Sequence, residues 1–454
     1  MLDKLRAMIS GVHAEFIDIR YEIKTETLIS FTGKEIRSVG SNRTDGYVIR
    51  VGRQGGFSSA TVTREEDVPR AIKLAVEGAD TIVATGGKKT ELAGVPVVTE
   101  TVKLQLDGDP RQVRIDDKIK LTREYNDLML EQPSIETTSI SYREVGREKY
   151  YVNSEGTQVS EELLTTGISG EAVAKRGSLV QNVRVSVGGA DGYNRLLDRH
   201  DVFRKKARIA EQLLDAEPVK GGTYDVVLSP NLAGVFTHEA FGHFSEADII
   251  EDNPSLREKM SLGEKLGSEA VTIVADSTLP SQLGYYRYDD EGVPVKPVTL
   301  MDRGVLTGRL HSRRTAAAFG EPVSGHAVAE DMRYEPIVRM GTIFIQPGDN
   351  SLEDLLKRMG DGLYLVDGKG GQTSGENFTF GAQYGYLVRN GELGSMVRDI
   401  NIMGNLFTTL QSIEAVGNEM ELSESGGCGK GQLNMKSALG GPSVLIRKMV
   451  VGGA

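Results

Sequence analysis

The sequence is poor in the side chains on which nucleic-acid-binding proteins depend. It contains no Trp, aromatic residues make up 6% of its 454 residues, and its formal net charge is −11. Scarce aromatic side chains leave few surfaces on which unpaired bases can stack, and nucleic-acid binders usually carry a basic surface. We therefore expect no nucleic-acid partner.

Cysteine and long apolar runs are also scarce. Cys428 is the single cysteine, which excludes an internal disulfide and suits a reducing compartment. No stretch approaches the roughly 20 apolar residues that span a bilayer. The first residues, from Met1 to Arg6, lack the apolar core of a secretion signal. We expect a cytoplasmic protein that has no membrane partner.

The remaining composition is that of a folded protein with more than one hydrophobic core. Apolar residues make up 39% and charged residues 26% of the chain, which is typical of globular proteins. A chain of 454 residues exceeds the usual size of a single core. We place a domain boundary at the Gly221-Gly222 pair, which predicts an N-terminal domain of residues 1–220 and a C-terminal domain of residues 221–454.

Strand and helix patterns occur in both halves of the chain. Alternating apolar residues predict a strand over 14–21, and a hairpin is expected around Gly55-Gly56. Apolar residues at helical spacing predict helices over 64–84, 116–130 and 201–216. Residues 224–228 have the pattern of a buried strand, and a further helix is expected to begin at Ser229-Pro230. Because strands and helices do not alternate strictly, we expect an α+β fold with two domains, largely antiparallel mixed sheets and packed helices.

The run His238-Glu239-Ala240-Phe241-Gly242-His243 on this last helix carries the chemistry. A catalytic zinc site needs protein ligands that leave one position open, together with a carboxylate that takes a proton from the metal-activated water. His238 and His243 are candidate ligands, and Glu239 is the candidate base.

The spacing of the two histidines departs from the usual helical pattern. Zinc-binding histidines on a helix are normally four residues apart, whereas His238 and His243 are five apart. On a regular helix five steps rotate the side chain by roughly 140°. A one-residue π-bulge near Gly242 would restore the facing. The alternative is that the first histidine lies on a solvated face and the second is packed and hydrogen-bonded.

Cys428 is the candidate third ligand. A thiolate binds zinc strongly, and the glycines on both sides allow close approach of the backbone. The alternative is that this cysteine fills a loop as a small buried apolar residue. The glycine-rich stretch also invites a phosphate-binding interpretation, but it lacks the spacing of a phosphate-binding loop.

Taken together, these motifs resemble the TldD/PmbA family over nearly the whole chain, and specifically its TldD-type members. The resemblance rests on Asn153-Ser154-Glu155-Gly156, the His238-to-His243 run, Glu246-Ala247-Asp248, Asp290-Glu291-Gly292-Val293-Pro294, Ser324-Gly325-His326, Arg339-Met340, Gly427-Cys428-Gly429-Lys430 and Val451-Gly452-Gly453. The order and spacing of these segments carry the match.

The resemblance implies a zinc-dependent peptidase that acts as a dimer on unfolded or extended peptides. It implies that His238, His243 and Cys428 bind the zinc and that Glu239 is the catalytic base. The dimer partner is expected to be a second copy or a PmbA-type paralogue, a type that lacks the metal motif. The alternative function is a non-catalytic binding or scaffold subunit. His326 and Arg339 are weaker candidates for orienting a peptide carbonyl.

Overall fold

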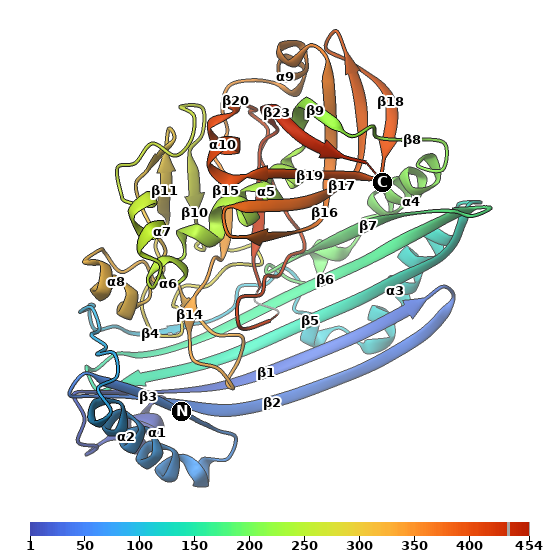
Figure 1. Cartoon of the computed structure of the whole chain (residues 1–454). Coiled ribbons are helices and arrows are strands. Elements are labelled where there is room, and N and C mark those ends of the chain that lie inside the picture. Colours follow the sequence, from blue (N-terminus) through green and yellow to red (C-terminus); the bar gives the residue numbers. More distant parts are fainter. Residues whose placement is uncertain (434–435, 454) are drawn as a thin grey trace.

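A computed structural model describes residues 1–433 and 436–453 of the chain. Its N-terminal half is built on a long, curved sheet with the strand order β3-β2-β1-β5-β6-β4, and β7 pairs with β6. These strands are β1 (Phe16–Thr32), β2 (Glu35–Arg53), β3 (Gly56–Val62), β4 (Thr99–Val102), β5 (Ile135–Asn153), β6 (Gln158–Arg176) and β7 (Leu179–Gly189). The long strands bring residues from both ends of the sheet beneath the C-terminal half (Figure 1).

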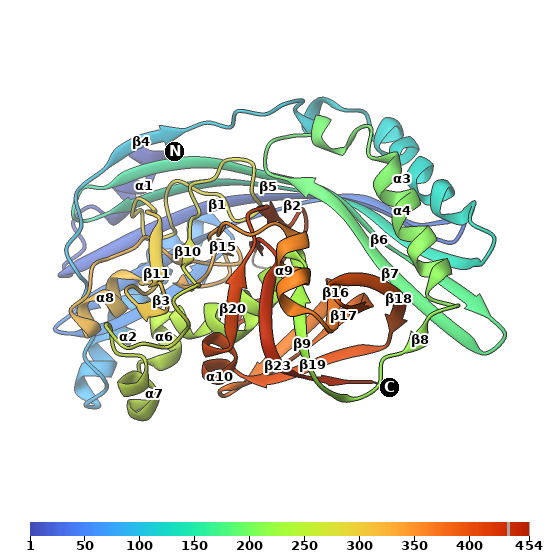
Figure 2. The ribbon, with the colours of Figure 1, turned by 90° about the horizontal axis from the view of Figure 1, so that it is seen from above.

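Helices cover this sheet at its two ends. They are α1 (Leu2–Ile9), α2 (Val68–Ala84), α3 (Ile115–Leu130) and α4 (His200–Gln212). The helices α1 and α2 pack on one end of the sheet and share an apolar core with it, while α3 and α4 form a second core at the other end (Figure 2). Burial of apolar side chains in these two places fixes the helices on the sheet.

The C-terminal half contains two further sheets. One has the strand order β16-β9-β23-β19-β17-β18-β8, with β20 paired to β23, and the other has the order β12-β11-β10-β15-β22-β21. The first comprises β8 (Glu217–Pro218), β9 (Gly222–Leu228), β16 (Gly362–Ser374), β17 (Asn377–Arg389), β18 (Glu392–Arg398), β19 (Ile400–Asn405), β20 (Ile413–Val416) and β23 (Val444–Gly452). The second comprises β10 (Ile273–Ala275), β11 (Val298–Asp302), β12 (Val305–Leu306), β15 (Thr342–Ile345), β21 (Glu421–Leu422) and β22 (Ala438–Gly441).

Short helices and a small strand pair complete this half. The helices are α5 (Pro230–Phe236), α6 (Ala247–Ile250), α7 (Pro254–Lys259), α8 (Arg313–Phe319), α9 (Leu352–Met359) and α10 (Leu406–Gln411), and β13 (Ala327–Val328) pairs with β14 (Ile337–Val338). A π-helix over Thr237–Gly242 follows α5 directly. The helix α5 and this π-helix lie between the two sheets and contribute Leu232, Phe236 and Phe241 to the largest apolar core.

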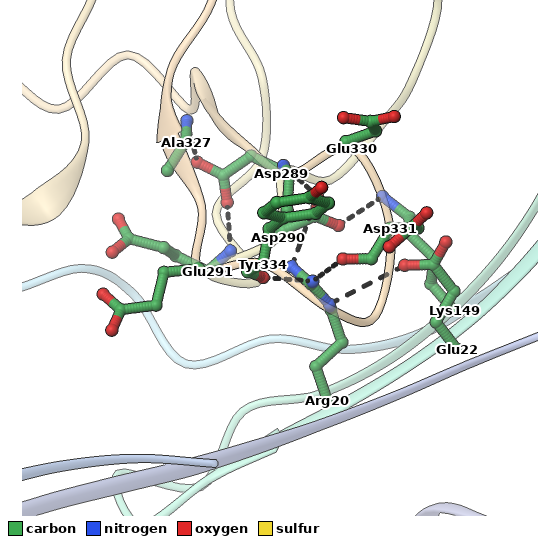
Figure 3. Close-up of polar contacts among 12 residues, drawn as sticks. Arg20, Glu22, Lys149, Asp289, Asp290, Glu291, Ala327, Glu330, Asp331 and Tyr334 are labelled. Carbon is green, nitrogen blue, oxygen red and sulfur yellow. Dashed lines mark hydrogen bonds and ion pairs between the residues drawn. The ribbon is translucent and has the colours of Figure 1, made fainter. Parts of the chain in front are cut away.

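Charged side chains fill the space between the long sheet and the C-terminal half (Figure 3). Asp290, in a loop of the C-terminal half, lies 3.4 Å from the Arg20 guanidinium on β1 and 3.3 Å from the Lys149 ammonium on β5. Asp290 also accepts a hydrogen bond from the Ala329 amide at 2.7 Å. The side chains of Arg20, Lys149 and Asp290 are almost fully buried, so the two halves are joined by a buried ionic network.

The expected α+β fold with largely antiparallel sheets is confirmed. Among the strand pairs of the described residues, β4–β6, β8–β18, β9–β16 and β15–β22 are parallel and the others antiparallel. The predicted helices are present with small shifts, since α2 begins at Val68 after a short 3₁₀ turn and α4 ends at Gln212. The division at residues 220 and 221 stays a prediction, because β8 precedes it and pairs with β18 beyond it. None of the helices within residues 1–433 and 436–453 has the length and apolar character that a bilayer crossing requires.

Candidate metal centre

The π-helix places both histidines of the sequence motif on the same side. A π-helix bonds residue i to residue i+5, and this is the separation of His238 and His243, which occupy the π-helix and the residue directly after it. The π-bulge that the five-residue spacing required is therefore present. His238 is only 3% exposed, so this turn is not a solvated helix face.

Two glycines that pack closely against neighbouring segments fix the position of this turn. A Cβ added at Gly242 would lie 2.2 Å from the sulfur of Met340, and one added at Gly234 in α5 would lie 2.4 Å from the backbone nitrogen of Gly440. The helix can therefore approach β22 and the segment before β15 only because these positions carry no side chain.

The three predicted ligands converge, although they come from distant parts of the chain. One ligand atom from each of His238, His243 and Cys428 lies within 4.8 Å of the other two. The Cys428 sulfur is 3.3 Å from Nε2 of His243, and the two imidazole rings are 5.1 Å apart, centroid to centroid, at an angle of 84°. Two imidazoles and a thiolate form a donor set that zinc favours. The residues present therefore fit the metal that the sequence predicts.

Electrostatic surroundings favour the thiolate form of Cys428. Burial raises the pKa of the thiol, but hydrogen bonds to His238 and His243 and the nearby charge of Arg339 outweigh burial and bring the pKa to about 5. Because a thiolate is the form that binds metals, this environment prepares Cys428 as a ligand at neutral pH.

Glu246 orients His243, a role that no pattern in the sequence predicts. A Glu246 carboxylate oxygen lies 3.1 Å from Nδ1 of His243, and the other oxygen accepts a hydrogen bond from the Met340 amide. Burial raises the pKa of this carboxyl group, but His243, Lys430 and Arg339 together lower it to about 2. A carboxylate on the outer nitrogen of a metal-binding histidine fixes the ring and its tautomer.

Lys430 is a second residue of the site whose role the sequence does not predict. Its ammonium donates to Asp248 at 2.6 Å and lies 3.3 Å from Glu246. These contacts tie the loop that carries Cys428 to the segment that follows the histidines. In the sequence these residues stand in two short motifs, Glu246-Ala247-Asp248 and Cys428-Gly429-Lys430. The two acidic residues and the lysine have opposite charges, but the sequence alone does not show that they form ion pairs.

Glu239, the candidate base, faces a cleft beside the metal-binding side chains. The cleft has a volume of about 670 Å³, and its walls include Glu239, His243 and Cys428. The backbone oxygen of Glu239 accepts a hydrogen bond from the Thr373 hydroxyl at 2.5 Å. This bond holds the π-helix against β16, and the half-buried Glu239 side chain is left facing the cleft.

The weaker candidates lie away from this cleft. His326 is fully buried, with Nδ1 3.0 Å from the Ser324 backbone oxygen, and burial lowers its pKa to about 4, so it is neutral at pH 7. Arg339 is buried behind Glu246, with its Nε 3.9 Å from that carboxylate. Neither side chain lines the cleft. The geometry therefore gives His326 no contact with a substrate bound there and leaves Arg339 next to Glu246.

Comparisons with protein families identify the group to which this site belongs. Descriptions of the PmbA/TldA metallopeptidases match the chain in three segments: domain 1 at residues 17–79, the central domain at 108–217 and the C-terminal domain at 221–453. The chain belongs to the TldD/PmbA family. Membership of a metallopeptidase family and the α+β fold, both expected from the resemblance, are therefore confirmed.

Relatives within the TldD/PmbA family align over almost the entire chain. A Synechocystis protein named as a metalloprotease is 38% identical over 443 residues, which are 97% of this chain and 95% of that protein. A Saccharolobus solfataricus protein named as a zinc metalloprotease TldD homolog is 32% identical over 454 residues, covering 97% of each chain. The segments that hold His238, His243 and Cys428 lie within the part that matches the C-terminal domain of the family.

Solved structures show the same fold. A Thermotoga maritima crystal structure superposes with a TM-score of 0.81 at 21% identity and covers 99% of both chains. The structure of TldE from Thermococcus kodakarensis superposes with a TM-score of 0.78 at 19% identity, also over 99% of both chains. At these identities the likeness concerns the arrangement of helices and strands alone.

Proposed function

We propose that this protein is a zinc peptidase whose metal is held by His238, His243 and Cys428. The observation that carries the proposal is the convergence of these three side chains at a cleft that Glu239 also lines. The name of the Saccharolobus relative, a zinc metalloprotease, supports the choice of metal. Three protein ligands leave a fourth position open, which is typical of catalytic rather than structural zinc sites.

Glu239 is the catalytic base in this proposal. Zinc bound here would supply a nucleophile at neutral pH, since it lowers the pKa of coordinated water to about 7. The Glu239 carboxylate, beside His238 in the chain and facing the cleft, accepts the proton of the attacking water and returns it to the leaving amine. Glu246 keeps the imidazole of His243 oriented throughout.

We infer that the substrate is an extended, unfolded peptide. The segment Gly371 to Ser374 of β16 borders the cleft and pairs with β17 on one side, whereas on its other side no strand of the described residues is paired with it. A free strand edge binds an extended peptide through main-chain hydrogen bonds, which are insensitive to side-chain identity. Unfolded polypeptides should therefore be cleaved and stably folded domains spared. Equal cleavage of a folded domain and its unfolded form would contradict this inference.

The active form in this proposal is a dimer with a second copy or with a PmbA-type paralogue. The fold is similar to that of TldE from Thermococcus kodakarensis. This similarity supports a dimer formed by two chains of the same fold. Light scattering at micromolar concentration, combined with a peptidase assay, tests the proposal. Full activity of a monomer would contradict it.

Two substitutions separate metal binding from proton transfer. Cys428→Ala removes one of three ligands, so zinc content and peptidase activity should both collapse. Glu239→Gln keeps the ligands and should retain zinc, while the rate falls by about 10²–10⁴-fold because an amide cannot accept the proton. Glu15→Gln, at an exposed glutamate outside the site, is the matched control for Glu239→Gln.

The measurements are zinc content after purification without chelators and turnover of an unstructured peptide. Near-normal turnover by the Glu239 variant, or full zinc in the Cys428 variant, would show that the roles are assigned wrongly. A wild-type protein that holds no zinc and cleaves no peptide would favour the alternative, a non-catalytic scaffold subunit.

A further inference from the structure

A second, narrow pocket lies where the long sheet meets the C-terminal half. Its volume is about 80 Å³, and it shares no lining residue with the cleft beside the metal-binding side chains. Strands β5 and β6 form one wall, and segments around Leu283, Val328 and Arg339 form the other. The pocket is large enough for several water molecules or a small organic group.

Positive charge dominates the lining of this pocket. The basic residues are Lys24, Arg143, Arg147, Arg339 and Lys436, and the single acidic residue among the lining residues is Glu330. Lys24 on β1 is paired with Arg147 on β5, and Arg143 and Arg147 project from the same face of β5 because side chains alternate along a strand. The sheet therefore presents a row of cations to the pocket.

Three of these five cations are balanced by carboxylates of the protein. Lys24 lies 3.5 Å from Asp331, Arg143 donates to Glu26 at 3.0 Å, and Arg147 donates to Glu22 at 2.8 Å. The neighbouring cations Arg20 and Lys149 are balanced in the same way, as Figure 3 shows for their contacts with Glu22 and Asp290. Buried cations in this region are thus normally paired, as the cost of burying a lone charge requires.

Arg339 departs from this pattern. Its side chain is 1% exposed, and none of its three guanidinium nitrogens has a hydrogen-bond partner among the described residues. Its ion-pair contact is with Glu246 at 3.9 Å, and that carboxylate already bonds to His243 and lies 3.3 Å from Lys430. A guanidinium group has five N–H donors, so Arg339 is left with unused donors in a buried place.

Lys436 is the second unbalanced cation. Within the part of the chain that the structure describes, no carboxylate forms an ion pair with its ammonium. Burial lowers the pKa of Lys436 to about 8, together with the positive charges of Arg143 and Lys24. The charge of Glu26 opposes this shift, but that carboxylate is already bonded to Arg143. Two insufficiently paired cations on one small pocket favour the binding of an anionic group there, because a buried charge is stabilised by an opposite one.

The apolar residues that line the pocket indicate which chemical group carries the anion. Leu104, Leu163, Leu283 and Tyr285 contribute apolar surface to the pocket. A carboxylate suits the basic side, because arginine binds it through parallel N–H bonds and lysine through its point charge. The apolar walls suit a short aliphatic group beside that carboxylate.

We propose that this pocket binds a carboxylate carried by a short apolar group. Such a group occurs at the C-terminus of a peptide and in an acidic side chain, and both offer the same chemistry to Lys436 and Arg339. The proposal does not depend on the zinc peptidase function, because the lining contains none of the proposed metal ligands. It can therefore be tested on metal-free protein.

Calorimetry with N-acetylated leucine as the probe tests the proposal. Metal-free protein should bind the free acid and not its carboxamide, which has the same shape without the charge. The second ligand is N-acetylaspartate α-amide, whose carboxylate lies on the side chain. Comparing the two ligands distinguishes binding of a peptide C-terminus from binding of an acidic side chain. Binding of either acid supports the proposal, and binding of neither, or equal binding of acid and carboxamide, overturns it.

Substitution of Lys436 shows whether binding takes place in this pocket. Lys436→Gln should weaken binding by about tenfold or more, since a hydrogen bond to a charged group contributes at least this much. Lys436→Arg keeps the charge and should retain most of the affinity. Lys120→Gln, which removes an exposed lysine of α3, is the matched control. Unchanged affinity in Lys436→Gln, with far-UV circular dichroism showing a folded protein, would overturn the assignment.

Discussion

Removing the charge of Asp290 should destabilise the protein strongly, because this carboxylate joins its two halves. Asp290 lies 3.4 Å from Arg20, 3.3 Å from Lys149 and 3.7 Å from Arg147, and all these side chains are largely buried. Two other carboxylates share the three cations: Glu22 lies 2.8 Å from Arg147, and Glu161 lies 3.1 Å from Lys149. The local charges balance as long as Asp290 is ionised, and these cations hold its pKa below the usual range.

Asp290→Asn keeps the size of the side chain and an oxygen that accepts the Ala329 amide, but it leaves one buried positive charge unbalanced. Breaking a buried ion pair on one side typically costs about 3–5 kcal/mol. With a urea slope of about 3 kcal/mol per molar, the unfolding midpoint should fall by about 1 M or more. Far-UV circular dichroism measures the transition, since the protein has no Trp.

A second substitution tests whether charge balance is the cause. Lys149→Met in the Asp290→Asn background removes the excess cation, so part of the lost stability should return. The control is Asp215→Asn, which breaks an exposed pair with Arg176 and should leave the midpoint unchanged. The reasoning is refuted if the Asp290 and Asp215 variants have equal midpoints, or if adding Lys149→Met only deepens the loss.

Three further substitutions test the metal centre and the acid stability. Gly242→Ala should destabilise the fold by about 1–3 kcal/mol and lower zinc occupancy, because its Cβ would lie 2.2 Å from the Met340 sulfur. Gly94→Ala, which has open space around it, is the control. Equal urea midpoints of these two variants would contradict the steric argument. Glu246→Gln should weaken zinc binding about 10–100-fold in competition with a chromophoric chelator, and unchanged affinity would remove its orienting role. Asp331 has a pKa lowered to about 2, so its contribution to stability is present above pH 4 and is lost as the pH falls through 2. Urea midpoints of Asp331→Asn should therefore depend less on pH over this range than those of the wild type, and parallel curves would contradict the assignment.

The sequence was sufficient to nominate the three converging side chains but not to place the groups that support them. The spacing of His238 and His243 and the glycine-flanked Cys428 made them candidates, and the family resemblance implied the complete ligand set. Glu246 and Lys430 belong to the 117 charged residues, and most charged residues lie on solvated surfaces. Their role arises from burial and from contacts between segments far apart in the chain, which no local pattern records.

The first long strand shows the same limit for the fold. Alternation along β1 predicted a strand with one apolar and one polar face, and Ile17 and Ile19 do pack into the core under α1 and α2. The polar face of such a strand commonly meets water, yet Asp18 and Arg20 are 2% and 3% exposed. The C-terminal half covers this face, and an ionic network between halves cannot be inferred from the period of one strand.

The distance in sequence between the converging side chains has a mechanical consequence. His243 and Cys428 are 185 residues apart, and the chain has no second cysteine with which to form a disulfide. An ion held by both would act as a cross-link and close a very long loop. The chain-entropy model gives about 5 kcal/mol for a permanent link across a loop of this order. Removal of the metal by a chelator would then remove this cross-link as well as the catalytic ion. Loss of metal would therefore shorten the lifetime of the folded chain in the presence of proteases.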